Sequence, residues 1–179
     1  MYTLIATESL LFVCLFASYF FLNSDDRWAT DQPPKLTYAL IMLFVLLLSS
    51  FVLGWGEKQA GAEQYGAARL ALWLTVLLGL GFMGLQYFEY GDHWKTLTPM
   101  SDSYGSIFYA ITTFHAAHVV MGLLMLGYVG ILPSYGPTRV PPYRPYHVAA
   151  LYWHFVDVVW IAVVGLLYIL PNLQGHVRA

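Results

Sequence analysis

Residues 40–48 read Leu-Ile-Met-Leu-Phe-Val-Leu-Leu-Leu and form the centre of an uncharged segment, 36–53. A membrane β-strand would alternate apolar and polar residues over about ten positions, and this run does not alternate. A helix needs about 20 mainly apolar residues to cross the hydrocarbon core, and it satisfies its own backbone hydrogen bonds there. The segment therefore predicts a transmembrane helix.

Four further segments are similarly long and apolar, and each holds one acid at most: 1–22, 70–88, 104–132 and 146–170. The connections between them are too short to divide the chain, so we expect a single transmembrane domain over 1–179. The first segment lacks a basic start and a small-residue cleavage site, and we interpret it as a retained helix. We predict an all-α polytopic membrane protein, a bundle of five helices at about 2–23, 36–55, 68–90, 104–132 and 146–170.

The composition excludes several other classes of protein. Hydrophobic residues make up 59% of the chain and charged residues 10%, whereas soluble domains are roughly 25% charged. The net charge of −2 offers no basic surface for nucleic acid. The single cysteine, Cys14, excludes an internal disulfide, a Cys-ligated zinc site and an iron–sulfur cluster; we expect it to be a small packed hydrophobe.

The charges do not decide how the helices are oriented. Lys and Arg residues divide four against four between the two sides, so the positive-inside rule gives no answer. Aromatic residues near the predicted helix ends are typical of the interfacial belt of membrane proteins. They are Trp28, Tyr38, Trp55, Tyr90, Trp94, Tyr104 and Tyr168.

Ionisable groups inside a membrane are costly, so they usually have a partner or a function. The candidates are Glu8, then Gln86 and Glu89 at the far end of the third segment, and two pairs spaced three residues apart on one helix face: His115 and His118, and His154 and Asp157. Their places along antiparallel helices predict that the last two pairs meet near the middle of the membrane. Three interpretations remain open: metal or haem ligation, a proton path, and a structural polar network, which we favour.

The sequence contains no motif for a nucleophile, a phosphate loop or paired catalytic carboxylates, so we predict no catalytic residue and no metal site. Arg139 and Arg144 lie in a proline-rich connection and Trp55 lies near a helix end. Lipid headgroups or a partner protein could bind these three residues, although charges in an ordinary solvated loop would look the same.

Residues 152–160, Tyr-Trp-His-Phe-Val-Asp-Val-Val-Trp, closely resemble the signature of cytochrome c oxidase subunit III. The resemblance continues over 7–12, 86–90, 102–106 and 112–122, in the order of that family. It implies a short, five-helix bacterial form that corresponds to helices three to seven of the longer seven-helix form. One departure is Trp-Gly-Glu-Lys at 55–58, where the family often has Trp-Ala-His-His.

The resemblance also implies a function. Subunit III holds no haem or copper, which lie in partner subunits; it packs on catalytic subunit I, in one complex with subunit II, and binds phospholipids. It supports proton uptake and protects the active site, and Glu8 matches the family's intramembrane carboxylate. We therefore expect a bacterial plasma-membrane protein with its N-terminus inside and C-terminus outside, whose oxidase can join a respiratory supercomplex. The chain would belong to an enzyme complex without holding a redox centre.

Four alternatives remain at this stage. Subunit III-like proteins also accompany nitric oxide reductases, and a quinol oxidase would carry a similar subunit. A haem-binding membrane anchor would use His115, His118 or His154. A small proton-coupled transporter would use Glu8, Glu89 and Asp157, although the chain has neither repeats nor broken helices.

Overall fold

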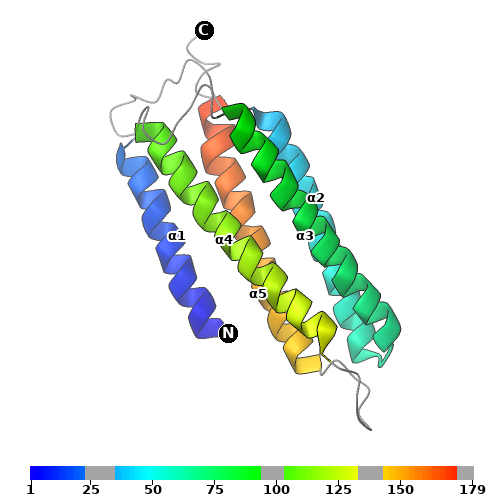
Figure 1. Cartoon of the computed structure of the whole chain (residues 1–179). Coiled ribbons are helices and arrows are strands. Elements are labelled where there is room, and N and C mark those ends of the chain that lie inside the picture. The colour runs from blue at the N-terminus through cyan, green and yellow to red at the C-terminus, as the bar shows by residue number, and fades with distance from the viewer. Residues whose placement is uncertain (23–34, 94–102, 133–142, 173–179) are drawn as a thin grey trace.

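The computed structural model describes residues 1–22, 35–93, 103–132 and 143–172. Five long helices fill these ranges, and all five are long and apolar enough to cross a membrane (Figure 1). They are α1 (Tyr2–Leu22), α2 (Leu36–Gly61), α3 (Tyr65–His93), α4 (Ser103–Ile131) and α5 (Tyr143–Val163), and α5 continues through the π-helical turn η1 (Val164–Ile169). The prediction of an all-α bundle with five transmembrane helices is confirmed.

The largest difference from the predicted bounds lies at 56–67, which we expected to connect two helices. In the structure α2 continues to Gly61 and α3 begins at Tyr65. The short turn between them closes through the amide of Gln64, which donates to the carbonyl of Gln59 at 2.9 Å. Charged residues mark where the hydrocarbon ends, but a helix without proline continues into the headgroup region.

The helix α5 lies at the centre of the bundle and α1 at its edge. Half of the apolar span of α5 is buried, against 11% of that of α1. The helices α2 and α3 form an antiparallel pair, α5 packs against both α2 and α4, and α1 packs mainly against α4. In Figure 1 α3 and α4 lie in front of α2 and α5, and the start of α1 lies at the opposite end of the bundle from η1.

A single indole ring joins four of these helices. Trp153 of α5 is fully buried, and its Nε1–H donates to Ser49 Oγ of α2 at 2.9 Å. The ring fits between Gly79 of α3 and Gly122 of α4, because a Cβ at either glycine would lie within 2.8 Å of it. Close approach of this kind is why small residues gather where membrane helices pack.

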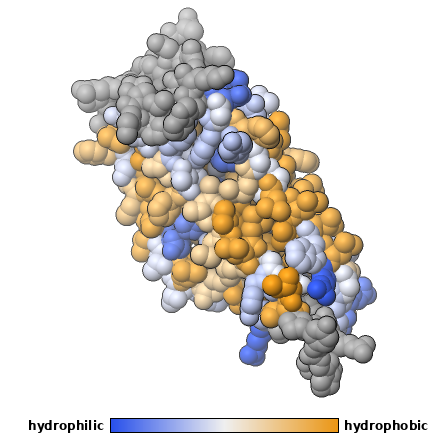
Figure 2. Space-filling model, viewed as in Figure 1, coloured by the Kyte–Doolittle hydropathy of each residue, from blue (hydrophilic) through white to orange (hydrophobic). Residues whose placement is uncertain are grey.

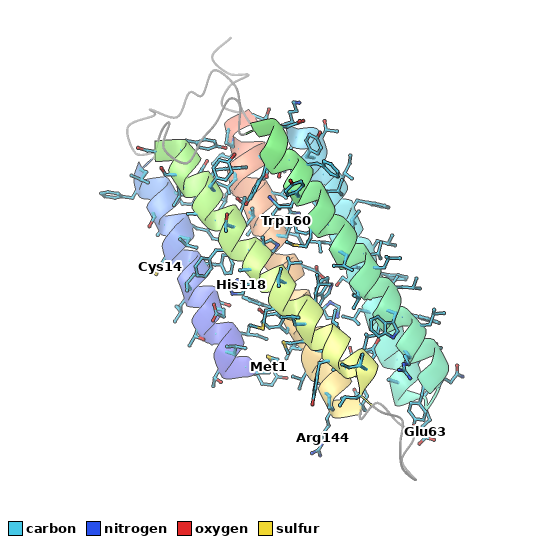
Figure 3. The ribbon with its side chains drawn as sticks, in the orientation of Figure 1. Met1, Cys14, Glu63, His118, Arg144 and Trp160 are labelled. Atoms are coloured by element: carbon cyan, nitrogen blue, oxygen red, sulfur yellow. The ribbon has the colours of Figure 1, made fainter. Side chains whose placement is uncertain are left out.

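Apolar side chains cover much of the outer surface, as a lipid environment requires. Leu77 and Leu80 of α3 and Leu124 of α4 are all more than half exposed. Figure 2 shows the resulting apolar surface in the middle of the molecule on this side. Cys14 also lies exposed on α1 and points away from the other helices (Figure 3), so the expectation that it is packed was wrong.

Candidate functional site

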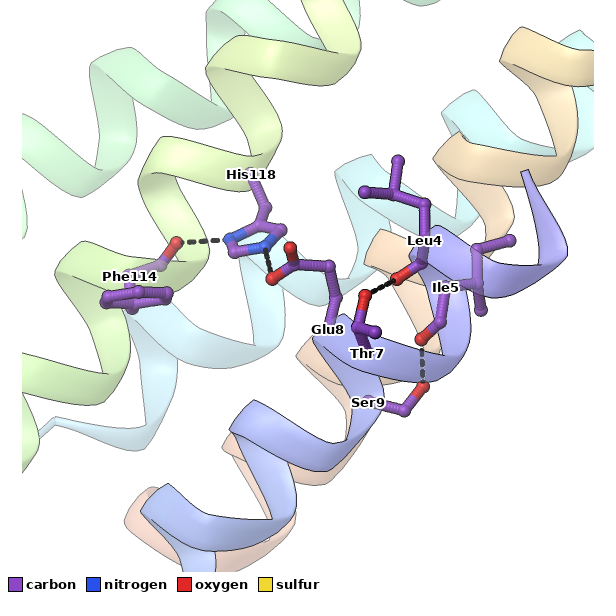
Figure 4. A network of polar contacts seen from close by, with 7 residues as sticks. All are labelled: Leu4, Ile5, Thr7, Glu8, Ser9, Phe114 and His118. Atoms are coloured by element: carbon purple, nitrogen blue, oxygen red, sulfur yellow. Dashed lines mark hydrogen bonds and ion pairs between the residues drawn. The ribbon is translucent and has the colours of Figure 1, made fainter.

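A pair of ionisable side chains, Glu8 and His118, links α1 to α4. Glu8 Oε2 lies 3.0 Å from His118 Nε2, and the other ring nitrogen, Nδ1, lies 2.7 Å from the carbonyl oxygen of Phe114 (Figure 4). A carbonyl only accepts hydrogen bonds, so Nδ1 carries a proton. Nε2 is therefore the nitrogen that faces Glu8, and the pair joins α1 to α4 inside the span.

Neighbouring polar groups on α1 do not compete for this contact. The hydroxyls of Thr7 and Ser9 donate to carbonyl oxygens of their own helix, at 2.8 and 2.7 Å. Phe12, one turn beyond Glu8, is buried with its ring centroid 5.1 Å from that of His118. Glu8 is therefore the group that reaches across, and Phe12 shields the contact from one end.

His115 has a different environment from His118, although both lie on α4. It is fully buried and stacks on Trp160 of α5, with the ring centroids 4.8 Å apart. Phe82 of α3 contacts both rings edge-on. Neither nitrogen of His115 has a hydrogen-bond partner within the described residues, and the same holds for Nε1 of Trp160. His115 thus connects α4 to α5 by ring stacking.

The polar pairs of α4 and α5, which were predicted to meet, have separate partners in the structure. The imidazole of His154 lies 2.5 Å from Ser50 Oγ of α2. Asp157 Oδ2 lies 4.0 Å from His154 Nδ1, within ion-pair distance but too far for a hydrogen bond, and neither carboxyl oxygen has a hydrogen-bond partner in the described ranges. Within those ranges no hydrogen bond or ion pair joins His115 or His118 to His154 or Asp157.

A second buried carboxyl group lies near the C-terminal end of α3. Glu89 is completely buried; its Oε1 accepts from the hydroxyl of Tyr168 at 2.9 Å, and its Oε2 accepts from Gln86 Nε2 at 3.3 Å. Tyr168 belongs to the π-helical turn, and Tyr104 donates to the carbonyl oxygen of Leu167 in the same turn. The assignment of Tyr104 and Tyr168 to the interfacial belt was wrong, because both are buried in the bundle.

Sequence reasoning missed one contact near the other end of the bundle. Glu57 of α2 lies 2.5 Å from the imidazole of His147 of α5, and Tyr143 stacks on that imidazole. Glu57 is one of the residues at which the chain departs from the family pattern. The spacing of seven residues between His147 and His154, which places both on one face of α5, is the signal that could have found it.

The residues suggested for lipid or partner contact are only partly placed. Trp55 is 44% exposed near the end of α2, and Arg144 is exposed in the first turn of α5 (Figure 3). Arg139 lies outside the described residues. No three His, Cys, Asp or Glu residues in the described part of the chain lie close enough to hold a metal ion.

The chain is similar to known proteins of one family over most of its length. Residues 1–171 match the sequence profile of the family "Cytochrome c oxidase subunit III". The chain is 31% identical over 169 residues to cytochrome c oxidase subunit 3 of Bacillus subtilis, covering 91% of this chain and 81% of that protein. It is 33% identical to the subunit 3 of Thermostichus vulcanus, covering 93% of this chain and 83% of that protein. It is 35% identical to the subunit 3 of Synechocystis, covering 93% of this chain and 72% of that protein.

Proposed function

Since the chain belongs to the cytochrome c oxidase subunit III family and is an integral multi-pass membrane protein of an oxidase complex, we propose that it is a non-catalytic subunit that packs on catalytic subunit I. Haem and copper belong to partner subunits, and subunit II lies in the same complex. The observation that carries this assignment is that the intramembrane polar groups make contacts between helices of this chain. Glu8, His118, His154 and Glu89 hold helices of this bundle together rather than surrounding an open reaction site.

The chain also supports proton uptake and the stability of the working oxidase. The supporting geometry is the Glu8–His118 contact, in which a carboxyl and an imidazole, both groups that can carry a proton, lie 3.0 Å apart inside the span. Since the side chain of Glu8 is 27% exposed, the pair is accessible from the edge of the bundle.

Phospholipid binds along the helix ends. A groove of about 170 Å³ between the start of α3 and the end of α4 is lined by Arg69 and Tyr65 at the polar end and by Leu72 and Val129 deeper in. A phosphate group pairs with the guanidinium, and an acyl chain follows the apolar wall. Trp55 and Arg144, both exposed near helix ends, provide further headgroup contacts.

The protein resides in the bacterial plasma membrane with its N-terminus inside and its C-terminus outside. The five spans among the described residues are an odd number, which supports termini on opposite sides, and the family resemblance supplies the direction. The complete oxidase reduces oxygen to water, translocates protons and takes part in a respiratory supercomplex.

The test is purification of the chain from native membranes in mild detergent. We expect a large haem-bearing subunit to co-purify, identified by mass spectrometry and by its reduced-minus-oxidised spectrum. Stripping this chain away should leave the haem with the partner. If haem stays with the isolated chain, the assignment is wrong and the histidines are ligands; if the haem-bearing partner is a nitric oxide reductase, the family assignment stands and the complex is different.

A further inference from the structure

Glu89, near the C-terminal end of α3, is a carboxyl group with no exposed surface. Its Oε1 lies 2.9 Å from the hydroxyl of Tyr168, and its Oε2 lies 3.3 Å from the amide nitrogen of Gln86. Both partners are neutral. Within the part of the chain that the structure describes, no lysine, arginine or histidine pairs with this carboxyl. A negative charge on Glu89 would therefore be buried without a counter-ion, which is a costly arrangement in a protein.

The other titratable groups around Glu89 are tyrosines from several helices. Five of them lie close enough to interact with it electrostatically: Tyr38 of α2, Tyr90 of α3, Tyr104 and Tyr109 of α4, and Tyr168 of η1. A phenol is neutral at physiological pH. These side chains therefore bring no positive charge that would balance a carboxylate.

Asp92, one turn further along α3, has the opposite environment. Its side chain is 48% exposed, and its Oδ2 lies 3.5 Å from Nζ of Lys35 and accepts from the hydroxyl of Tyr38 at 3.0 Å. Asp92 thus has water and a cation to balance a negative charge, and Glu89 has neither. Two carboxyl groups only about 4.5 Å apart along the helix axis are placed so that one favours the charged form and the other the neutral form.

The amide beside Glu89 shows where a proton would be used. Gln86 is buried, and its Oε1 has no hydrogen-bond partner within the described residues. The oxygen and nitrogen of an amide are assigned from the hydrogen bonds around them, so either end can face Glu89. A carboxylate only accepts hydrogen bonds, whereas a protonated carboxyl also donates one. A proton on Glu89 therefore adds a donor beside an amide oxygen that lacks one, while Tyr168 still donates to Oε1.

We infer that Glu89 is a proton-binding site, separate from Glu8, which holds its proton at neutral pH and joins α3 to η1 as a neutral acid. The π-helical turn brings Tyr168 against this carboxyl, and Tyr104 of α4 donates to the carbonyl oxygen of Leu167 in the same turn at 2.8 Å. The proton thus lies where α3, α4 and the end of α5 meet. The inference concerns this chain alone and does not rest on the function proposed above.

Infrared difference spectroscopy tests this inference, because a protonated carboxyl group has a C=O stretching band in a region where carboxylates do not absorb. The sample is the full chain in mild detergent with every subunit that co-purifies, since whatever the two samples share cancels in the difference. At neutral pH, wild type minus Glu89→Gln should show a protonated-carboxyl band. Asp92→Asn is the matched control on the same helix, and its difference spectrum should show a carboxylate band instead.

Tyr168→Phe gives a second measurement, which decides the question even where Glu89→Gln does not fold. This change removes the donor to Oε1 of Glu89, so the protonated-carboxyl band should remain and move to higher frequency. Loss of a carboxylate band in Glu89→Gln, without loss of a protonated-carboxyl band, would overturn the inference. So would a protonated-carboxyl region that Tyr168→Phe leaves unchanged.

Discussion

The contact of Trp153 with two glycines leads to a quantitative prediction for Gly122→Ala. A Cβ at this position would lie 2.8 Å from Trp153 Cε3 and 3.0 Å from Cζ3, well inside van der Waals contact. The ring cannot move away easily, because Gly79 contacts its far edge and Ser49 holds its N–H. Overpacking of a rigid core costs about 1–3 kcal/mol.

Gly127→Ala is the matched control on the same helix. Its Cβ would meet nothing within 4 Å. Both substitutions gain about 0.5–1 kcal/mol from the higher helix propensity of alanine, and this term cancels between them. The Gly122→Ala variant should therefore unfold at a free energy about 1–3 kcal/mol below that of Gly127→Ala, which is the overpacking cost alone.

The assay is unfolding of the purified chain in mixed detergent micelles, followed by tryptophan fluorescence as the denaturing detergent is increased. Gly79→Ala and Gly81→Ala form a second pair on α3, since a Cβ at Gly81 also meets nothing within 4 Å. Equal stability of Gly122→Ala and Gly127→Ala would refute the close packing of α4 on α5 at Trp153.

Three further outcomes are expected. Glu8→Gln should keep α1 attached and the oxidase turning over, with a modest change in proton uptake or catalytic lifetime; complete loss of oxygen reduction in an intact complex would contradict this. Glu8→Leu should make α1 more accessible to proteases, because His118 loses its partner. Tyr168→Phe should lower stability by about 1–3 kcal/mol, measured by thermal unfolding, because Glu89 loses a buried donor. Asp157→Ala should lower recovery of the assembled complex more than Asp157→Asn, which keeps the size and polarity of the side chain; equal recovery by native gel would count against a polar role for this side chain.

The helices were predictable from the sequence because a helix that crosses the hydrocarbon core needs about 20 mainly apolar residues with few charges. The end of α2 was not predictable, since the first charged residues show where the lipid ends and not where the helix ends. Glu57 and Lys58 were taken as a connection because they are charged, yet both lie within α2, which continues to Gly61. Helix length beyond the membrane depends on propensity and on packing against α3, and a charge pattern reports neither.

The partners of the polar residues were harder to predict. Three residues along a helix turn the side chain by about 300°, so His115 and His118 point about 60° apart. That difference is enough for His118 to face α1 and for His115 to face α5. Spacing reveals a shared face, but the choice between two neighbouring helices depends on the rotation of α4 in the bundle. The Tyr168–Glu89 contact depends on a π-helical turn, which a sequence pattern of period 3.6 does not reveal.

The helix α5 shows why a single short run carries so much of the resemblance to the family. Trp153 and Trp160 point into the bundle, where one ring fills the space at the two glycines and the other stacks on His115. His154, adjacent to Trp153 in sequence, points about 100° away and remains partly exposed. The buried side of α5 thus holds the chain together, while His154 on the other side bonds to Ser50 of α2 and stays partly exposed. A change on the buried side should therefore lower the stability of the isolated chain more than a change at His154, because His154 is partly exposed and loses only its contact with Ser50.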